Sequence, residues 1–159
     1  MGITIRTAVK ADFAAVQQVA QTAWEAAYKD LIPMAVQEQF LAKAYSTDQL
    51  HHKLEKTIFF VGEMENEVVA FANLHRSKQE NNLSAIYVDP AFQSKGLGSA
   101  LLKEIKKALQ SGDELVVYLE KGNHQAETFY RKHGFTYVKT FSETLLNHTF
   151  QTVKMAVVI

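Results

Sequence analysis

The segment from residue 82 to residue 110 constrains the fold more than any other part of this chain. It runs from an apolar, strand-like stretch at 82–88 through a loop into Gly96-Leu97-Gly98 and an amphipathic helical pattern. The chain has only 7 glycines and 2 prolines, yet Pro90, Gly96 and Gly98 all fall in this one connection. A strand, a loop rich in glycine and proline, and a helix in this order indicate an α/β fold.

The glycines also predict an anion site at the start of this helix. The first backbone amides of a helix have no internal partner, and the helix dipole adds about half a positive charge there. Glycines let a phosphate approach these amides without meeting a Cβ atom. The spacing fits neither a P-loop nor a dinucleotide fingerprint. A tight strand-to-helix connection without any ligand is the alternative explanation.

The remaining hydrophobic patterns predict one α/β domain, residues 1–159, with a mixed sheet. Alternating or continuous apolar runs predict strands, and apolar spacing of three and four residues predicts helices. Asp12 is the expected cap of the first helix. The expected strands are 3–9, 57–64, 67–76, 82–88, 114–120, 135–141 and 149–158, and the expected helices are 12–27, 34–44, 47–56, 97–110 and 124–132.

Composition excludes several classes of protein. Lys and Arg together number 17, as do Asp and Glu, so no basic excess favours nucleic acid as a partner. The absence of cysteine excludes disulfides and thiolate chemistry and fits a cytoplasmic protein. No apolar run approaches the roughly 20 residues that span a bilayer, so we expect no membrane partner. The histidine spacing predicts no metal site.

Two motifs together resemble the GNAT superfamily of N-acetyltransferases. Gln93, Gly96 and Gly98 match the family's coenzyme A signature, Q/R-x-x-G-x-G/A. NHQAETFYRKHGF at 123–135 resembles the family block N-x-x-A-x-x-F-Y-x-x-x-G-F. The resemblance implies a mixed, mostly antiparallel sheet of about six to seven strands flanked by helices, with two strands splayed apart at the coenzyme A site.

The same resemblance implies acetyl-CoA as co-substrate and assigns the residues that bind it. Backbone amides of the glycine loop would hold the pyrophosphate, and the strand before the loop would pair with the pantetheine arm. Lys103, Lys106 and Lys107 are expected to form a solvated helix face. The implied cofactor-binding residues are Ile86, Tyr87, Val88, Gln93, Ser94, Lys95, Gly96, Leu97, Gly98, Ser99, Asn123 and Tyr130.

Tyr130 occupies the position of the family's general acid. A phenol of pKa about 10 can protonate a departing thiolate, whose pKa is about 8.5. Packing beside Phe129 in the core is the alternative role for Tyr130. Many relatives carry a glutamate base on the strand before the loop, but residues 83–86 include no carboxylate. Glu63, Glu120 and His124 are candidate substitutes, and none is assigned.

The acceptor is expected over the N-terminal helices and a loop at 141–149. Trp24, Glu25 and Tyr28 are candidate substrate residues, through charge and cation–π contacts, although the helical stripe favours Trp24 as core. The expected acceptor is a primary amine of a small molecule or peptide. The layout is loosely similar to a bacterial branch that includes polyamine acetyltransferases. A non-catalytic acyl-CoA sensor is the alternative function, and the two late strands are a candidate homodimer surface.

Overall fold

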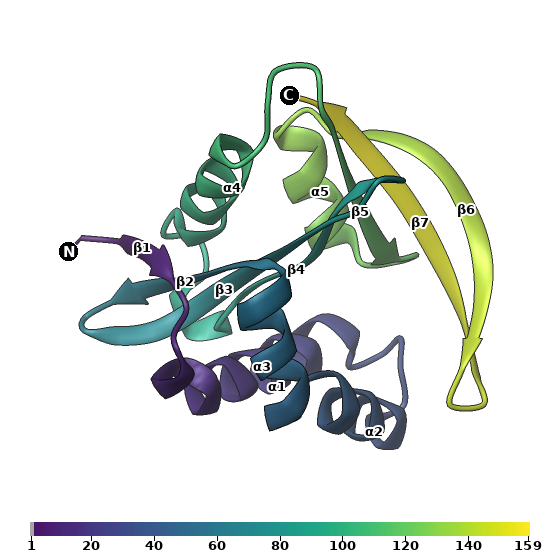
Figure 1. Ribbon diagram of the computed structural model, residues 1–159. Helices are drawn as coiled ribbons and strands as arrows, with labels where there is room; N and C mark the ends of the chain where they lie inside the picture. Colours follow the sequence, from purple (N-terminus) through teal and green to yellow (C-terminus); the bar gives the residue numbers. More distant parts are fainter. Residues whose placement is uncertain (1) are drawn as a thin grey trace.

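The computed structural model describes residues 2–159 as a seven-stranded sheet flanked by helices (Figure 1). The strand order is β1-β2-β3-β4-β5-β7-β6. The strands are β1 (Thr4–Thr7), β2 (Ile58–Met64), β3 (Glu67–Arg76), β4 (Asn81–Val88), β5 (Glu114–Glu120), β6 (Thr136–Leu145) and β7 (His148–Val158). The helices are α1 (Phe13–Tyr28), α2 (Met34–Ala44), α3 (Thr47–Lys56), α4 (Leu97–Lys107) and α5 (His124–Lys132).

The sheet is mixed, as the sequence predicted. Every neighbouring pair of strands is antiparallel except β4 and β5, which run parallel. A parallel pair needs a crossover connection, and α4 provides it. β4 and β5 pair only at Asn81–Leu115 and Asn82–Val116. The two strands therefore diverge beyond their first residues, which confirms the predicted splay.

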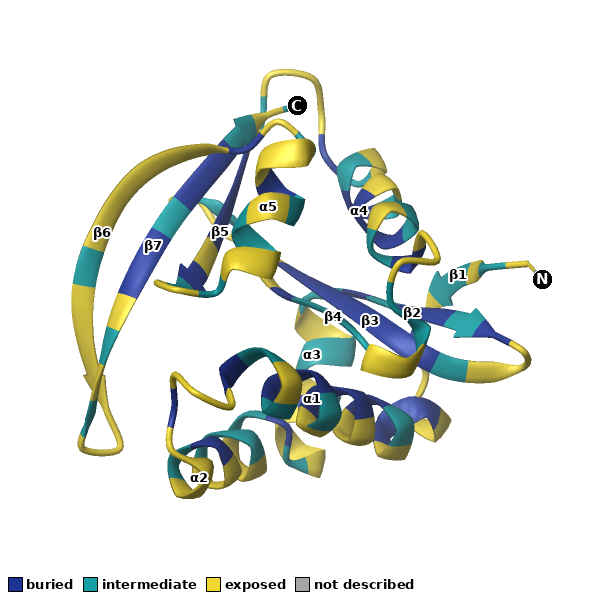
Figure 2. Cartoon of the chain, turned by 180° about the vertical axis from the view of Figure 1, so that it is seen from behind, coloured by how far each residue is buried: buried dark blue, intermediate teal, exposed yellow. Residues whose placement is uncertain are grey.

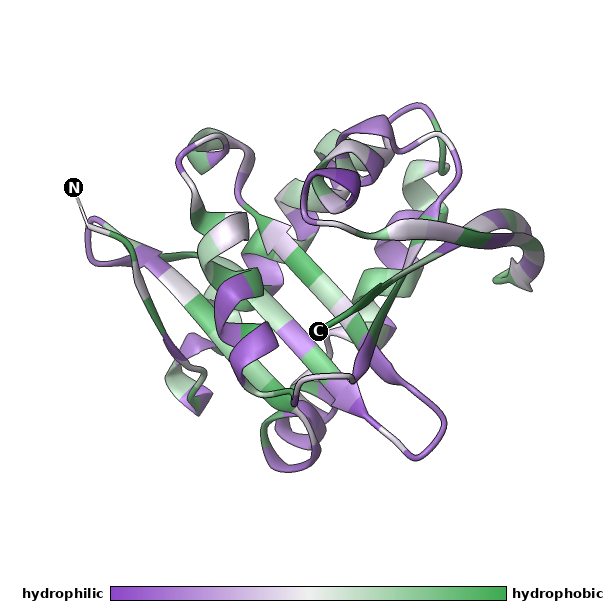
Figure 3. Cartoon of the chain, turned by 90° about the horizontal axis from the view of Figure 1, so that it is seen from above, coloured by the Kyte–Doolittle hydropathy of each residue, from purple (hydrophilic) through white to green (hydrophobic). Residues whose placement is uncertain are grey.

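Helices cover both faces of the sheet and bury one apolar layer on each. α1 and α3 lie on one face with α2 beside them, while α4 and α5 lie on the other (Figures 1 and 2). Phe13, Val16 and Leu50 pack with Phe71 of β3 on the first face. Leu101 and Ile105 pack with strand residues on the second. Apolar colouring accordingly follows the central strands, while peripheral loops are hydrophilic (Figure 3).

The late hairpin differs from the expected loop at 141–149. β6 continues to Leu145 and β7 begins at His148, so only Leu146 and Asn147 form the turn. Both turn residues have positive φ, 53° and 62°, which suits a tight hairpin turn. β6 is the edge strand and is exposed along nearly all of its length (Figure 2). The segment expected to contact the acceptor is therefore the end of a β-hairpin and not an irregular loop.

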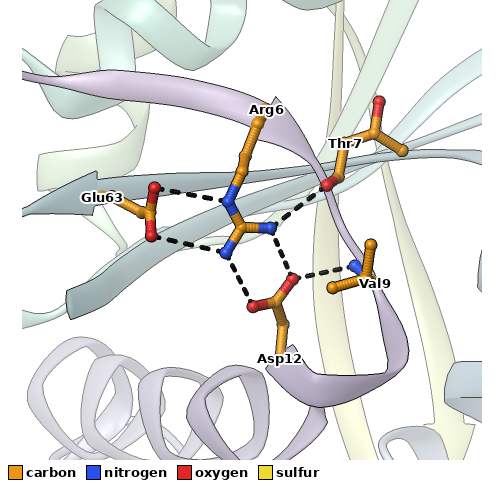
Figure 4. Close-up of polar contacts among 5 residues, drawn as sticks. All are labelled: Arg6, Thr7, Val9, Asp12 and Glu63. Atoms are coloured by element: carbon orange, nitrogen blue, oxygen red, sulfur yellow. Dashed lines mark hydrogen bonds and ion pairs between the residues drawn. The ribbon is translucent and has the colours of Figure 1, made fainter. Parts of the chain in front are cut away.

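Asp12 stabilises the start of α1 in a different way from the predicted cap. Its carboxylate makes no hydrogen bond to the helix amides. It accepts instead from Arg6 Nη1 and Nη2, at 2.8 and 2.9 Å, and from the Val9 N–H at 2.8 Å (Figure 4). Arg6 also pairs with Glu63 at 3.3 Å. The predicted cap is therefore wrong in its partner, because the carboxylate faces Arg6 of β1 and the Val9 N–H and not the first amides of α1.

None of the helices described between residues 2 and 159 combines the length and the apolarity needed to cross a membrane.

Replacing Asp12 with Asn is expected to destabilise the protein by about 1–3 kcal/mol, because the donors on Arg6 and Val9 lose the charged acceptor that the buried Asp12 side chain provides. The Arg6 hydrogen bonds, followed by the Val9 N–H, lower the pKa of Asp12. Its stabilisation is therefore complete above the unfolded pKa, about 3.9, and disappears as the pH falls through the folded value. Urea denaturation at pH 7 and stepwise below pH 5 measures both effects.

Asp30→Asn is the control, because Asp30 is exposed and the change is expected to stay within about 0.5 kcal/mol. A D12N penalty that stays constant down to acid pH would contradict the role assigned to the Arg6 pair.

Candidate active site

A bulge in β4 begins the separation of β4 from β5. The register between β3 and β4 shifts at Asn73/Leu74, so Ser84 has no partner in β3. Its hydroxyl donates to Asn73 Oδ1 at 2.9 Å and lies 3.1 Å from the Asn73 carbonyl oxygen. Asn73 is buried, and its Nδ2 donates to Thr57 Oγ1 at 2.6 Å. This side-chain network anchors the irregularity, which redirects the rest of β4.

A cavity of about 510 Å³ lies where the two strands diverge. It extends from the glycine loop, along β4 and β5, to the C-terminal end of α1. Its lining includes twelve of the residues predicted from the sequence: Tyr28, Ile86, Tyr87, Val88, Gln93, Ser94, Gly96, Leu97, Gly98, Ser99, Asn123 and Tyr130. Residues missed from the sequence, such as Phe92, Tyr118, Leu119 and Gln125, also line it.

The glycine loop presents unpaired backbone amides to this cavity. Gly96 precedes the helix with φ of 91°, a conformation that L side chains rarely adopt. The first hydrogen bond of α4 joins the Ala100 N–H to the Gly96 carbonyl at 3.0 Å. The amides of Leu97, Gly98 and Ser99 therefore precede the helical hydrogen-bond ladder. This is the geometry that binds a phosphate or pyrophosphate.

Gly98 has a packing role as well as an expected binding role. A Cβ atom at this position would lie 3.0 Å from Cε1 of Phe129 in α5. Gln125 Nε2, also from α5, donates to Gln93 Oε1 at 3.0 Å. The two sequence motifs are thus in direct contact. A side chain at Gly98 would press on the Phe129 ring, and Tyr130 follows Phe129 on α5.

Three tyrosines line the inner part of the cavity. Burial raises the pKa of Tyr28, Tyr87 and Tyr130 above the ordinary value of 10. The neighbouring Tyr87 contributes further to the rise at Tyr130. Tyr130 also packs edge-on against Phe129, with ring centroids 5.5 Å apart. These phenols remain protonated at neutral pH and can act as hydrogen-bond donors.

Asn123 lies where β5 turns into α5, lines the same cavity and contacts Tyr28. Its Oδ1 accepts from the Ala126 N–H at 3.2 Å and caps the helix. The capping bond fixes the side chain at the cavity wall and leaves its amide NH₂ as a donor.

The predicted acceptor residues do not share one location. Tyr28 is buried and lines the cavity. Trp24 stacks on Phe40 with centroids 4.7 Å apart, packs against Tyr28 and is outside the lining, as a core residue would be. Glu25 is half-buried and is also outside the lining. Lys95 of the glycine loop is exposed and likewise outside it.

Of the three candidate bases, Glu120 lies nearest the tyrosine end of the cavity. Glu63 pairs with Arg6 at the β1–β2 edge, and His124 is exposed. Glu120 ends β5, and its charge contributes to the raised pKa of Tyr28. Burial raises the pKa of Glu120, and the Gln151 N–H, 3.3 Å from Oε1, opposes this rise. Within residues 2–159 the cavity lining has no carboxylate, and no cluster could hold a metal ion.

Comparison with known proteins agrees with this geometry. A family model described as "Acetyltransferase (GNAT) domain" matches residues 55–137. Spermidine N(1)-acetyltransferase of Thermoplasma acidophilum is 24% identical over 143 residues, which cover 85% of this chain and 89% of that protein.

Two solved structures illustrate the shared fold. The PaiA N-acetyltransferase from Thermoplasma acidophilum, solved with coenzyme A, superposes with a TM-score of 0.83 at 22% identity and covers 100% of both chains. The ribosomal-protein-S18-alanine N-acetyltransferase from Escherichia coli gives 0.72 at 23% identity, over 99% of this chain and 94% of that one.

Proposed function

Because the chain belongs to the GNAT family of acetyltransferases, which use acetyl-CoA, we propose that it transfers the acetyl group directly to a primary amine in the cavity between β4 and β5. The proposal rests on one observation: the unpaired amides after Gly96 and the Tyr130 side chain line the same cavity. The amides suit the pyrophosphate, and the diverging strands leave backbone groups for the pantetheine arm. In this proposal the thioester lies toward the tyrosine end of the cavity.

Tyr130 supplies the proton that the leaving group needs. A neutral amine attacks the thioester carbonyl and forms a tetrahedral oxyanion with a C–N bond. The C–S bond then breaks, coenzyme A leaves as a thiolate, and the nitrogen releases its extra proton to water as the amide forms. Tyr130, whose pKa is raised by burial, holds its proton at neutral pH and can donate it as the C–S bond breaks. The resulting phenolate regains a proton from water, which balances the proton that the amine has released. No covalent enzyme intermediate is required, and the chain has no cysteine to form one.

The acceptor that the site supports best is a polyamine. The spermidine acetyltransferase of Thermoplasma acidophilum gives this class its first support. The second support is Glu120. It is half-buried, its charge acts on Tyr28, and it lies on the same sheet face as Tyr118. A carboxylate there attracts a cationic acceptor, while the uncharged tyrosine lining favours the neutral form of the reacting amine.

Tyr130→Phe is expected to lower kcat by about 10²–10⁴, because the thiolate loses its proton donor. Binding of acetyl-CoA should change little. Thiol release with spermidine, an alanine-terminated peptide and an aminoglycoside as acceptors measures the effect and identifies the acceptor class. Tyr137→Phe is the matched control, since Tyr137 is exposed. Wild-type rates in Tyr130→Phe, with a substrate that turns over, would contradict the assignment.

Glu120→Gln is expected to raise KM for spermidine roughly tenfold, because a charged hydrogen-bond acceptor contributes about 1.5–3 kcal/mol. A monoamine acceptor should be affected less, which separates charge recognition from a loss of structure. Glu114→Gln, at the other end of the same strand, serves as the control. Equal increases in KM from both substitutions would argue against an acceptor-binding role for Glu120.

A further inference from the structure

Tyr118 of β5 lines the cavity just beyond the point where β5 separates from β4. The last paired residues are Asn82 and Val116, and Tyr118 follows on the diverging part of β5. Successive strand residues face opposite sides of a sheet, so Tyr118 points away from the face on which Leu119 packs with α4 and α5. Tyr130 belongs to that other face (Figure 1). The two tyrosines therefore line the cavity from opposite faces of the sheet.

The Tyr118 hydroxyl donates to a carboxylate that lies outside the cavity lining. Its Oη is 2.7 Å from both Oε1 and Oε2 of Glu80. Glu80 belongs to the turn between β3 and β4, where the Ser77 N–H donates to the Glu80 carbonyl at 3.0 Å and the Glu80 N–H donates to Ser77 Oγ at 3.2 Å. Within residues 2–159, no other side chain of the cavity lining hydrogen bonds to a carboxylate.

Neighbours on β6 and β7 hold the Tyr118 ring and act on its charge. Phe141 packs edge-on with ring centroids 6.0 Å apart, and Lys154 Nζ lies 5.9 Å from the ring centroid. Burial, followed by the Glu80 hydrogen bond and the charges of Glu80 and Glu143, raises the pKa of Tyr118 to about 12. The phenol therefore stays protonated at neutral pH. It can take up a proton only while it passes its own proton to Glu80.

Acetyl transfer needs a group that takes up a proton as well as one that supplies it. A primary amine has a pKa of about 10.4, and its nitrogen carries an extra proton once it has attacked the thioester carbonyl. The nitrogen must lose this proton before a neutral amide can form. Within residues 2–159 no carboxylate lines the cavity, so a carboxylate can act there only through a second group.

We propose that Tyr118 and Glu80 form a proton relay that deprotonates the attacking amine. As the C–N bond forms, a nitrogen proton moves to Tyr118 Oη while the hydroxyl proton of Tyr118 moves to Glu80. The phenol stays neutral and Glu80 becomes protonated. Glu80 then releases the proton to water at the β3–β4 turn, whose residues 77–79 are exposed.

The relay gives the two cavity faces complementary roles. Tyr118 contacts the amine and Glu80 acts through it, while Tyr130 supplies the proton for the sulfur from the opposite face. The proton released by nitrogen thus reaches water through two protein groups. The inference rests on the proposed acetyl transfer and adds to it the group that accepts the proton of the acceptor amine.

Tyr118→Phe and Glu80→Gln test the relay in a thiol-release assay on the full chain. The acceptor is whichever of spermidine, an alanine-terminated peptide and an aminoglycoside the wild type turns over fastest. Each substitution should lower kcat by roughly 10²-fold, as expected for the loss of an acid–base group. The KM for the amine and the calorimetric Kd for coenzyme A should change little. Phenylalanine keeps the ring that packs on Phe141, and a thermal melt verifies folding.

Formate separates a proton relay from a structural contact. Glu80→Ala leaves space beside the Tyr118 hydroxyl for a small carboxylate, so added formate should restore part of kcat in this variant. Formate should not restore Tyr118→Phe, which lacks the relaying hydroxyl. If Glu80 merely held the β3–β4 turn in place, its loss would not be repaired by a free carboxylate.

Tyr137→Phe and Glu67→Gln are the matched controls, because both residues are exposed and lie on other strands. Both variants should keep the wild-type kcat. Wild-type kcat in Tyr118→Phe or Glu80→Gln, or no recovery of Glu80→Ala in formate, would overturn the relay alone. An absence of thiol release by the wild type with all three acceptors would overturn the proposed acetyl transfer together with it.

Discussion

The divergence of β4 from β5 is the constraint on which the rest of the site depends. Parallel strands normally pair along their length, but here the ladder ends after two residue pairs. Ser84, held by Asn73, is the extra residue that redirects β4. The opened gap leaves backbone groups and tyrosine side chains beside a cavity that a continuous sheet would close. The glycine loop and α4 then place free amides at the end of that gap.

The contact between Gly98 and Phe129 couples the two halves of the site. The amides that suit a pyrophosphate belong to α4, whereas the proposed acid belongs to α5. A Cβ atom at position 98 would lie 3.0 Å from the Phe129 ring, so the absence of a side chain there lets the ring pack close to the loop. Gly98 therefore contributes to the packing beside Tyr130 as well as to the loop itself. This explains in physical terms why the two motifs occur together in one chain.

Local patterns were sufficient to predict the element order and the sheet class, and with the family resemblance they gave about half of the cavity lining. Apolar periodicity located all seven strands, and the glycine loop located the free amides. Features that depend on how the elements pack together were not predictable. Asp12 has the sequence of a helix cap, but its partner Arg6 lies on a strand. The turn at Leu146–Asn147 contains neither glycine nor proline, so the ends of the two late strands were expected to be a loop at 141–149. The α4 lysines were expected on a solvated face, but Lys103, Lys106 and Lys107 line a groove that His133 also lines.

The central claim is that the amides opening α4 bind coenzyme A. A titration followed by ¹H–¹⁵N correlation spectra observes these groups directly. The account predicts that coenzyme A shifts the Leu97, Gly98 and Ser99 amide resonances most, together with those of β4 residues 86–88. The contrary result would be a saturable titration in which these amides stay unchanged while resonances elsewhere in the chain move.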